Sequence, residues 1–168
     1  FLRFLLVTCL ISTTLIAQAQ FKVVGYLWSR TNIVQDLNEV NLDKITHLNI
    51  AFINPDSVTA AFASFPALDT VVQRAHEKNV KVLLSLAGGS DQSQYAVLLQ
   101  KENRTAFIAK IMDLVKEYNV DGIDVDIEGK NIDNNYEAFV TELSAQLKSK
   151  GKLITGAVAW WTRNRITD

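Results

Sequence analysis

The chain has 168 residues, of which 48% are hydrophobic and 21% charged, with only two prolines, and this composition excludes a disordered or fibrous protein. The formal net charge is -1 and no block of like charges occurs, which argues against nucleic-acid binding or a membrane-surface patch. We therefore expect a globular protein with a neutral or weakly charged partner and no nucleic acid.

The N-terminus is typical of a secretory signal peptide. Arg3 precedes an apolar run at 4–11, and small and polar residues follow as far as Ala19. The run is too short to span a bilayer, so we predict that residues 1–19 are removed and that the mature chain has no membrane span. Cys9 lies in this segment, so we expect a disulfide-free secreted or periplasmic protein from a bacterial host. The chain starts with Phe rather than Met, so we expect its start to be truncated.

Runs rich in β-branched, aliphatic and aromatic residues alternate with helical periodicity along the rest of the chain. The predicted strands are 21–29, 46–53, 80–87, 120–128 and 153–160, and the helical stripes are 68–75, 107–118 and 136–147. The segment 32–44 is a weaker helical candidate. Strands separated by helices predict an α/β fold with a parallel sheet, either closed as a barrel or open and doubly wound. In both architectures function lies at the carboxyl ends of the strands.

Asparagine and glycine mark several predicted helix ends. Asn79 and Asn119 each follow a helical stripe and precede a valine that opens a strand, which predicts left-handed caps. Asn134 or Asn135 is the predicted N-cap of the third helix, and Gly151 is its predicted C-cap.

The stretch VDGIDVDIEG at 120–129 carries acids at every second position, namely Asp124, Asp126 and Glu128. On a strand this alternation makes one face apolar and the other acidic. Aspartate is depleted in strands and like charges oppose pairing, so the pattern favours function over stability. Neighbouring carboxylates raise one another's proton affinity, so we predict that one of them holds a proton near neutral pH, as a general acid must.

This stretch resembles the DGxDxDxE signature of glycoside hydrolase family 18, the chitinases and endo-β-N-acetylglucosaminidases. KVLLSLAGGS at 81–90 resembles the family's S-x-G-G segment, with Ser85 in place and Ala87 where the first glycine is usual. HLNIAFI at 47–53 and VVGYLW at 23–28 resemble the second and first strands.

The resemblance implies a (β/α)₈ TIM barrel, of which residues 20–168 would form the N-terminal part with about five strands and four βα units. It also implies retaining, substrate-assisted hydrolysis of β-1,4-linked N-acetylglucosamine in chitin or chitooligosaccharides, without a metal or organic cofactor. Glu128 would protonate the glycosidic oxygen and later activate water. Asp126 would orient the acetamido group and stabilise the oxazolinium ion, and Asp124 would tune Asp126.

Other residues receive smaller roles. Tyr26 and one of Trp160 and Trp161 are predicted to contact substrate, because aromatic rings pair an apolar face with polar edges. Asp121 falls out of step with the alternating acids, so its side chain would point to the other face of the strand, and it is predicted to cap the start of that strand. Ser85 and Gly88 are expected to permit close packing. His76 and His47 form no metal-ligand spacing and receive no role.

Four alternatives remain open. The acids could be a solvated face of an edge strand, or ligands of an EF-hand-like calcium loop, although position twelve would be Asn135 rather than Glu. The protein could be a non-catalytic carbohydrate-binding barrel such as a chitinase-like lectin, or a small flavodoxin-like module of five strands. A TIM barrel needs eight strands and about 250 residues, so we expect this chain to be part of a longer one and inactive alone. Oligomeric state stays open.

Overall fold

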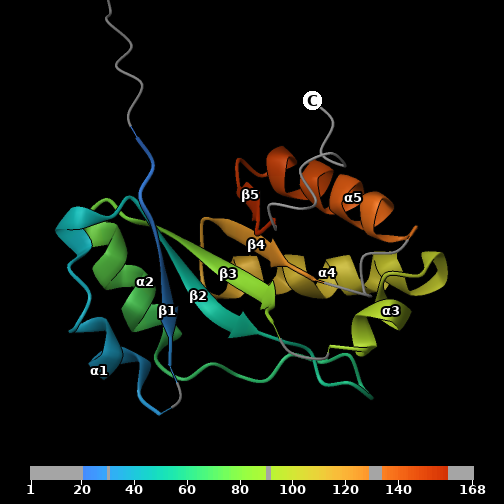
Figure 1. Cartoon of the computed structure of the whole chain (residues 1–168), viewed down its shortest axis with the longest axis horizontal. Helices are drawn as coiled ribbons and strands as arrows, with labels where there is room; N and C mark the ends of the chain where they lie inside the picture. The colour runs from blue at the N-terminus through green and yellow to red at the C-terminus, as the bar shows by residue number, and fades with distance from the viewer. Residues whose placement is uncertain (1–20, 30, 90–91, 129–133, 159–168) are drawn as a thin grey trace, which may run out of the picture.

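The computed structural model describes residues 21–29, 31–89, 92–128 and 134–158, and its centre is a sheet of five parallel strands (Figure 1). The strands are β1 (Val24–Trp28), β2 (His47–Ile53), β3 (Lys81–Ala87), β4 (Gly122–Asp126) and β5 (Leu153–Gly156). Their order in the sheet is β1-β2-β3-β4-β5. Sequential order is that of a barrel, whereas doubly wound sheets reverse order at a switch point. The order of the strands confirms the predicted incomplete (β/α)₈ barrel. The alternative of a flavodoxin-like module is wrong, because its sheet would reverse order.

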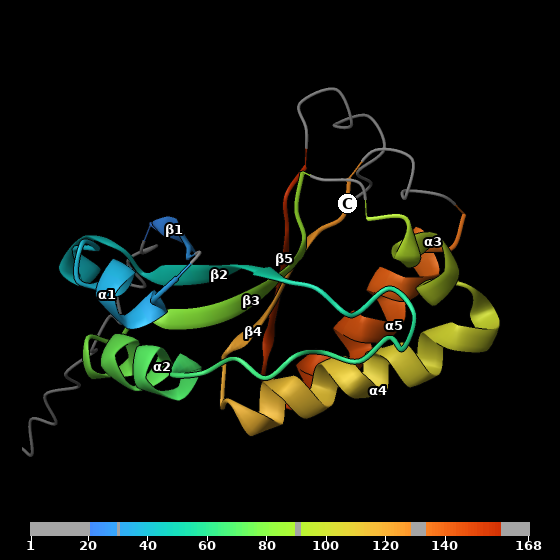
Figure 2. The ribbon, with the colours of Figure 1, turned by 90° about the horizontal axis from the view of Figure 1, so that it is seen from below.

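Helices connect successive strands, and Figure 2 shows α2 and α4 on the same side of the sheet. The elements are α1 (Ile33–Leu37), the 3₁₀ turn η1 (Leu42–Lys44), α2 (Leu68–Glu77), α3 (Gln94–Leu98), α4 (Lys101–Glu117) and α5 (Tyr136–Ser149). The predicted stripes on α2, α4 and α5 are confirmed. The five-residue helix α3 was not predicted, because it is too short to show a period.

The outward face of the sheet packs against these helices to form the core. Outward-facing residues of β1 to β4, such as Leu84 on β3 and Val125 on β4, are buried in one cluster with the apolar stripes of α2, α4 and α5, and Ile154 of β5 packs against it partly buried. The intervening residues face the other way, and on β2, β3 and β4 they include buried polar side chains. The sheet therefore has an apolar outer face and a polar inner face, as the alternation in 120–128 predicted.

Helix ends follow the sequence in part. Asn79 and Asn119 have φ of 58° and 49°, which confirms both left-handed caps, and Gly151 has φ of 66° directly after the C-cap of α5. Asn135 occupies the N-cap position of α5, but its side chain makes no capping hydrogen bond.

Strand β4 ends earlier than predicted. The run 120–128 was expected to be one strand, but pairing stops at Asp126, opposite Ala87 of β3. Ala87 has φ of 74°, so β3 turns away at that level and leaves residue 128 without a partner strand. Glu128 therefore lies in the loop at the carboxyl end of β4. The predicted signal peptide 1–19 lies outside the described residues, and none of the described helices is long and apolar enough to cross a bilayer.

Candidate active site

One row of side chains crosses the whole sheet on its inner face. The register pairs Trp28 with Ala51, Ala51 with Ser85, Ser85 with Asp124, and Asp124 with Thr155. Because paired residues of neighbouring parallel strands point to the same side, these five side chains share the inner face. Parallel pairing thus brings two hydroxyl groups level with the first acid of β4.

Asp124 lies at the centre of a hydrogen-bond cluster and is 2% exposed. Its Oδ2 accepts hydrogen bonds from the hydroxyls of Tyr26 and Ser85, each at 2.8 Å, and its Oδ1 accepts one from Thr155 at 2.6 Å. These donors come from β1, β3 and β5. Hydroxyl donors to an ionised carboxylate compensate the loss of water around a buried charge.

Tyr26 shows how strongly the sheet curls. It lies on β1, which is separated from β4 by two strands, and yet its hydroxyl contacts an acid 98 residues away in sequence. Burial and the hydrogen bond to Asp124 raise the pKa of Tyr26 to about 12, so the hydroxyl stays a donor. The predicted substrate contact of Tyr26 stays a prediction, and the structure gives its hydroxyl a partner within the protein.

Asp126 is the acid with the perturbed pKa. It is 8% exposed, and burial together with the negative charges of Glu128 and Asp124 raises its pKa to about 6. The sequence predicted that one acid holds a proton near neutral pH, as a general acid must, and the raised pKa belongs to Asp126, the predicted charge stabiliser. The role of general acid predicted for Glu128 stays a prediction. The hydroxyl of Tyr136, at the start of α5, belongs to the same surroundings, because burial and then the charges of Asp124 and Asp126 raise its pKa.

Glu128 lies at the rim and is exposed. A Cβ placed on Gly89 would be 3.8 Å from Oε2 of Glu128, so the carboxylate lies beside the loop that follows β3. Exposure therefore increases along the acidic face, from Asp124 and Asp126 to Glu128. Because its side chain is exposed, Glu128 can contact a ligand at the carboxyl ends of the strands without a rearrangement of the protein.

The loop after β3 packs tightly on Phe52. Gly88 has φ of 88°, and a Cβ at this position would lie 2.7 Å from the Phe52 ring, so only glycine permits the contact. This confirms the close packing expected at Gly88. The peptide bond between Ala51 and Phe52 is cis. Ser85 is fully buried, in agreement with the close packing expected there, and its hydroxyl also donates a hydrogen bond to Asp124.

A second polar cluster lies at the opposite end of β4. The carboxylate of Asp121 accepts hydrogen bonds from the backbone N–H of Val82 at 2.9 Å, from Lys81 at 2.9 Å and from His76, whose Nε2 lies 2.7 Å away. Although burial opposes ionisation, these donors lower the pKa of Asp121. The predicted cap is confirmed, and His76, which received no role from the sequence, is part of it.

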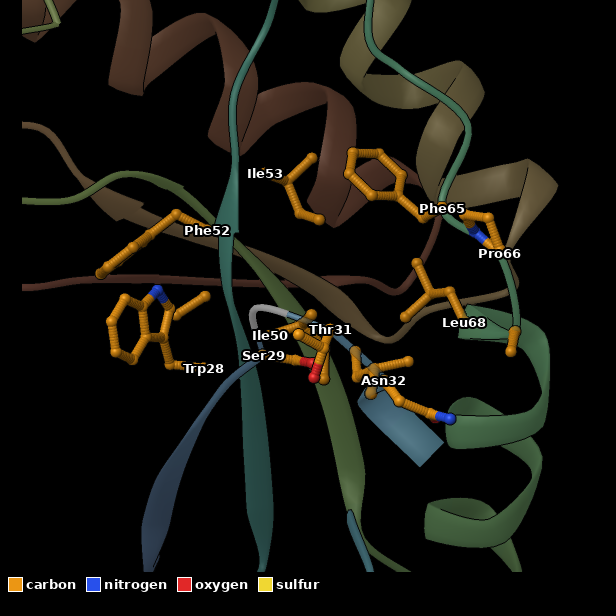
Figure 3. Close-up of a pocket in the computed structure, with 13 residues that line it drawn as sticks. Trp28, Ser29, Thr31, Asn32, Ile50, Phe52, Ile53, Phe65, Pro66 and Leu68 are labelled. Carbon is orange, nitrogen blue, oxygen red and sulfur yellow. The ribbon is translucent and has the colours of Figure 1, made fainter. Parts of the chain in front are cut away.

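A pocket of about 610 Å³ opens at the carboxyl ends of β1 and β2 (Figure 3). Trp28 and Phe52 lie on one side of β2 in this view, and Phe65, Pro66 and Leu68 lie on the other. Trp28 is 56% exposed, so it offers a ring face to a ligand. The acids are not among the lining residues. Trp160 and Trp161 lie outside the described residues and stay predictions.

Two alternatives from the sequence are wrong. The acids do not form a solvated edge, because β4 lies between β3 and β5 and two of its acids are buried. An EF-hand loop follows a helix, whereas Asp124 and Asp126 belong to a strand. Within the part of the chain that the structure describes, no group of three or more metal-ligating side chains gathers.

The family model described as "Glycosyl hydrolases family 18" matches residues 22–164. The chain belongs to this family. A family 18 chitinase from the chitin utilization locus of Flavobacterium johnsoniae superposes with a TM-score of 0.72 at 34% identity, over 80% of this chain and 46% of that one. A chitinase from Bacteroides thetaiotaomicron gives a TM-score of 0.68 at 30% identity, over 84% of this chain and 48% of that one.

Curated relatives are also similar over part of their length. A class V chitinase of Medicago truncatula is 28% identical over 145 residues, which cover 76% of this chain and 38% of that protein. A chitinase-like effector of Moniliophthora perniciosa is 37% identical over 100 residues, 55% of this chain and 23% of that protein. The chain thus spans less than half the length of these relatives. They include plant and fungal proteins besides the bacterial structures, so a bacterial host stays a prediction.

Proposed function

We propose that the full-length protein is a glycoside hydrolase that cleaves β-1,4-linked N-acetylglucosamine in chitin or chitooligosaccharides with retention of configuration. The observation that carries the proposal is the graded acid row in a family 18 chain. Asp124 is buried and hydrogen-bonded, Asp126 is buried with a pKa of about 6, and Glu128 is exposed at the rim. A row of this kind supplies an acid and a charge stabiliser but leaves the nucleophile to the sugar.

In the proposed reaction, Glu128 donates its proton to the glycosidic oxygen. The carbonyl oxygen of the sugar's own acetamido group attacks the anomeric carbon from the opposite face as the bond to the leaving sugar breaks. Asp126 orients the acetamido group and stabilises the positive oxazolinium ring, and the charge of Asp124 tunes Asp126 from deeper in the barrel. The ionised Glu128 then takes a proton from water, whose oxygen opens the ring on the original face and restores the starting configuration.

The position of each acid suits its part. Proton transfer to a leaving group requires contact with substrate, and Glu128 is the exposed member of the row. Charge stabilisation is stronger where water is excluded, and Asp126 is 8% exposed. The rings of Tyr26 and Trp28, both on β1, are proposed to line the sugar site together with Trp160 or Trp161.

The test is Glu128→Gln in the full-length protein, with Glu137→Gln as the matched control because Glu137 is an exposed residue on α5. Hydrolysis of chitooligosaccharides and of a chromogenic N-acetylglucosaminide is measured. General acid catalysis contributes about 10²–10⁴-fold, so kcat falls by that range in Glu128→Gln and stays unchanged in the control. The first product detected by NMR is the β-anomer. Equal rates for the two variants, or an α-anomer formed first, contradict the proposal.

We further propose that the protein is exported and that residues 20–168 contribute only part of its barrel. Strands β1 and β5 have one paired neighbour each among the described strands, and an open sheet edge is a site for further strand pairing. The 168-residue chain alone is therefore expected to hydrolyse little or no substrate. The same assay on this chain and on the full-length protein tests the expectation, which equal specific activities contradict.

A second candidate function is sugar binding without hydrolysis, which the chitinase-like effector among the relatives makes worth testing. Quenching of tryptophan fluorescence by chitooligosaccharides measures binding, and chromatography of the same samples measures cleavage. Saturable binding with intact oligosaccharide in the full-length protein supports this candidate. Cleavage that is lost in Glu128→Gln supports the hydrolase.

A further inference from the structure

Thr155 on β5 belongs to no motif in the sequence, and yet it makes the shortest hydrogen bond in the acid cluster. It pairs with Asp124 in the β4–β5 register, and its Oγ1 donates to Oδ1 at 2.6 Å. The bonds from Tyr26 and Ser85 both reach Oδ2, at 2.8 Å. A distance of 2.6 Å is in the range of hydroxyl hydrogen bonds to an ionised oxygen.

We propose that Thr155 is a positioning residue, whose hydroxyl fixes the carboxylate plane of Asp124 and keeps its negative charge in place beneath Asp126. The inference rests on the proposed hydrolase function, because it assigns Thr155 to the same row of acids.

The two oxygens of Asp124 are held in different ways. Donors that share Oδ2 define one point of the carboxylate and leave rotation about the Cβ–Cγ bond open. A donor on Oδ1 adds the second point and closes that rotation. Thr155 is the donor to Oδ1 among the described residues. Among the described strands β5 pairs with β4, and this pairing sets Thr155 opposite Asp124, so the hydroxyl is what links the side chain to the site.

The charge of Asp124 acts on its neighbour. It is one of the causes that raise the pKa of Asp126, after burial and the charge of Glu128. Without the Thr155 hydroxyl, the carboxylate of Asp124 can turn about the Cβ–Cγ bond, and its negative charge is no longer held in place beside Asp126. The pKa of Asp126 then falls toward its ordinary value. The reaction slows as well, because the charge stabiliser is no longer held in its productive position.

The experiment compares Thr155→Val with Thr155→Ser in the full-length protein. Valine keeps the β-branched shape that suits a strand and removes the hydroxyl, whereas serine keeps the hydroxyl. A hydrogen bond to a charged group contributes enough for about a tenfold effect, so kcat for chitooligosaccharides falls about tenfold in Thr155→Val with KM within about twofold. Thr155→Ser stays within about twofold of the wild type in both constants.

Titration of the Asp126 carboxyl group by ¹³C NMR provides a readout besides activity. The wild type titrates near pH 6, Thr155→Val titrates lower by about half a pH unit or more, and Thr155→Ser matches the wild type. Thr155→Ala, which removes the hydroxyl without adding a methyl group, gives the same shift as valine.

The proposal is overturned if Thr155→Val and Thr155→Ala leave both kcat and the titration unchanged, or if Thr155→Ser is impaired as strongly as valine. Failure of the hydrolase function is a separate result. It appears as full activity in Glu128→Gln, and in that case the NMR titration of the Thr155 variants still decides whether the hydroxyl controls the acid pair. If Glu128→Gln loses activity while Thr155→Val keeps the wild-type kcat and the wild-type Asp126 titration, the role of Thr155 is overturned and the hydrolase function stands.

Discussion

The charge of Asp126 destabilises the folded protein above pH 6, and Asp126→Asn removes this effect. The side chain is buried next to two other acids, and its pKa is about 6 instead of the ordinary 3.8. The folded state therefore keeps a proton between about pH 4 and pH 6 that the unfolded chain has already released. By linkage, the stability associated with this group is fully present below pH 4 and is lost as pH rises through 6.

The magnitude follows from the difference between the two pKa values. One pH unit corresponds to about 1.4 kcal/mol, so ionising Asp126 costs the folded state about 2–3 kcal/mol. Asparagine has nearly the same shape and carries no charge at any pH. We therefore expect Asp126→Asn to be more stable than the wild type by about 2–3 kcal/mol at pH 7.5, relative to their difference at pH 4.

Urea unfolding of the full-length protein at pH 4, 5, 6 and 7.5 measures this difference. Asp113→Asn is the matched control, because Asp113 is an exposed acid on α4. The free energy of unfolding of the control is expected to run parallel to that of the wild type across the whole pH range. For Asp126→Asn, the difference from the wild type is expected to grow between pH 4 and 6 and then to stay constant. Parallel curves for Asp126→Asn and the wild type would show that this carboxyl group titrates normally and would refute the electrostatic reasoning.

Two further predictions concern stability. Gly88→Ala places a Cβ against the Phe52 ring in a left-handed conformation, so the free energy of unfolding falls by about 2–4 kcal/mol in urea, whereas Gly89→Ala changes it little. Asp121→Asn loses a hydrogen-bonded charge near Val82, so it is less stable by about 1–2 kcal/mol at pH 7. Because the pKa of Asp121 is lowered in the folded state, this difference shrinks as pH falls below about 4 and is lost as pH falls through the folded-state pKa. An unchanged difference at pH 3 contradicts that explanation.

The sequence predicted the two faces of β4 but not the end of the strand. Alternation is a local property, so the period of two placed Val125 in the core and Asp124 on the inner face. The end depends on the neighbour. Pairing stops at Asp126 because Ala87 on β3 adopts φ of 74°, and no pattern within 120–128 records that turn.

The partners of the acids were beyond the reach of sequence reasoning. Tyr26 was chosen for its ring and Ser85 for its small size, and Thr155 was not singled out at all. Their common contact with Asp124 depends on the register of separate strand pairs and on the curl of the sheet. These are properties of the assembled sheet, and a scan for motifs within one strand cannot detect them.

The difference in environment among three chemically similar groups explains why an acidic strand is both tolerated and reactive. The charge of Asp124 is compensated by hydroxyls from three other strands, and Glu128 reaches solvent. Asp126 lies between them, buried and next to both charges, so the electrostatic cost of the row concentrates on this residue and appears as its raised pKa. In the proposed reaction, a cationic ring intermediate would relieve that repulsion, whereas a neutral substrate would not. Under this proposal, the repulsion that lowers the stability of the fold is the same interaction that favours the transition state over the bound sugar.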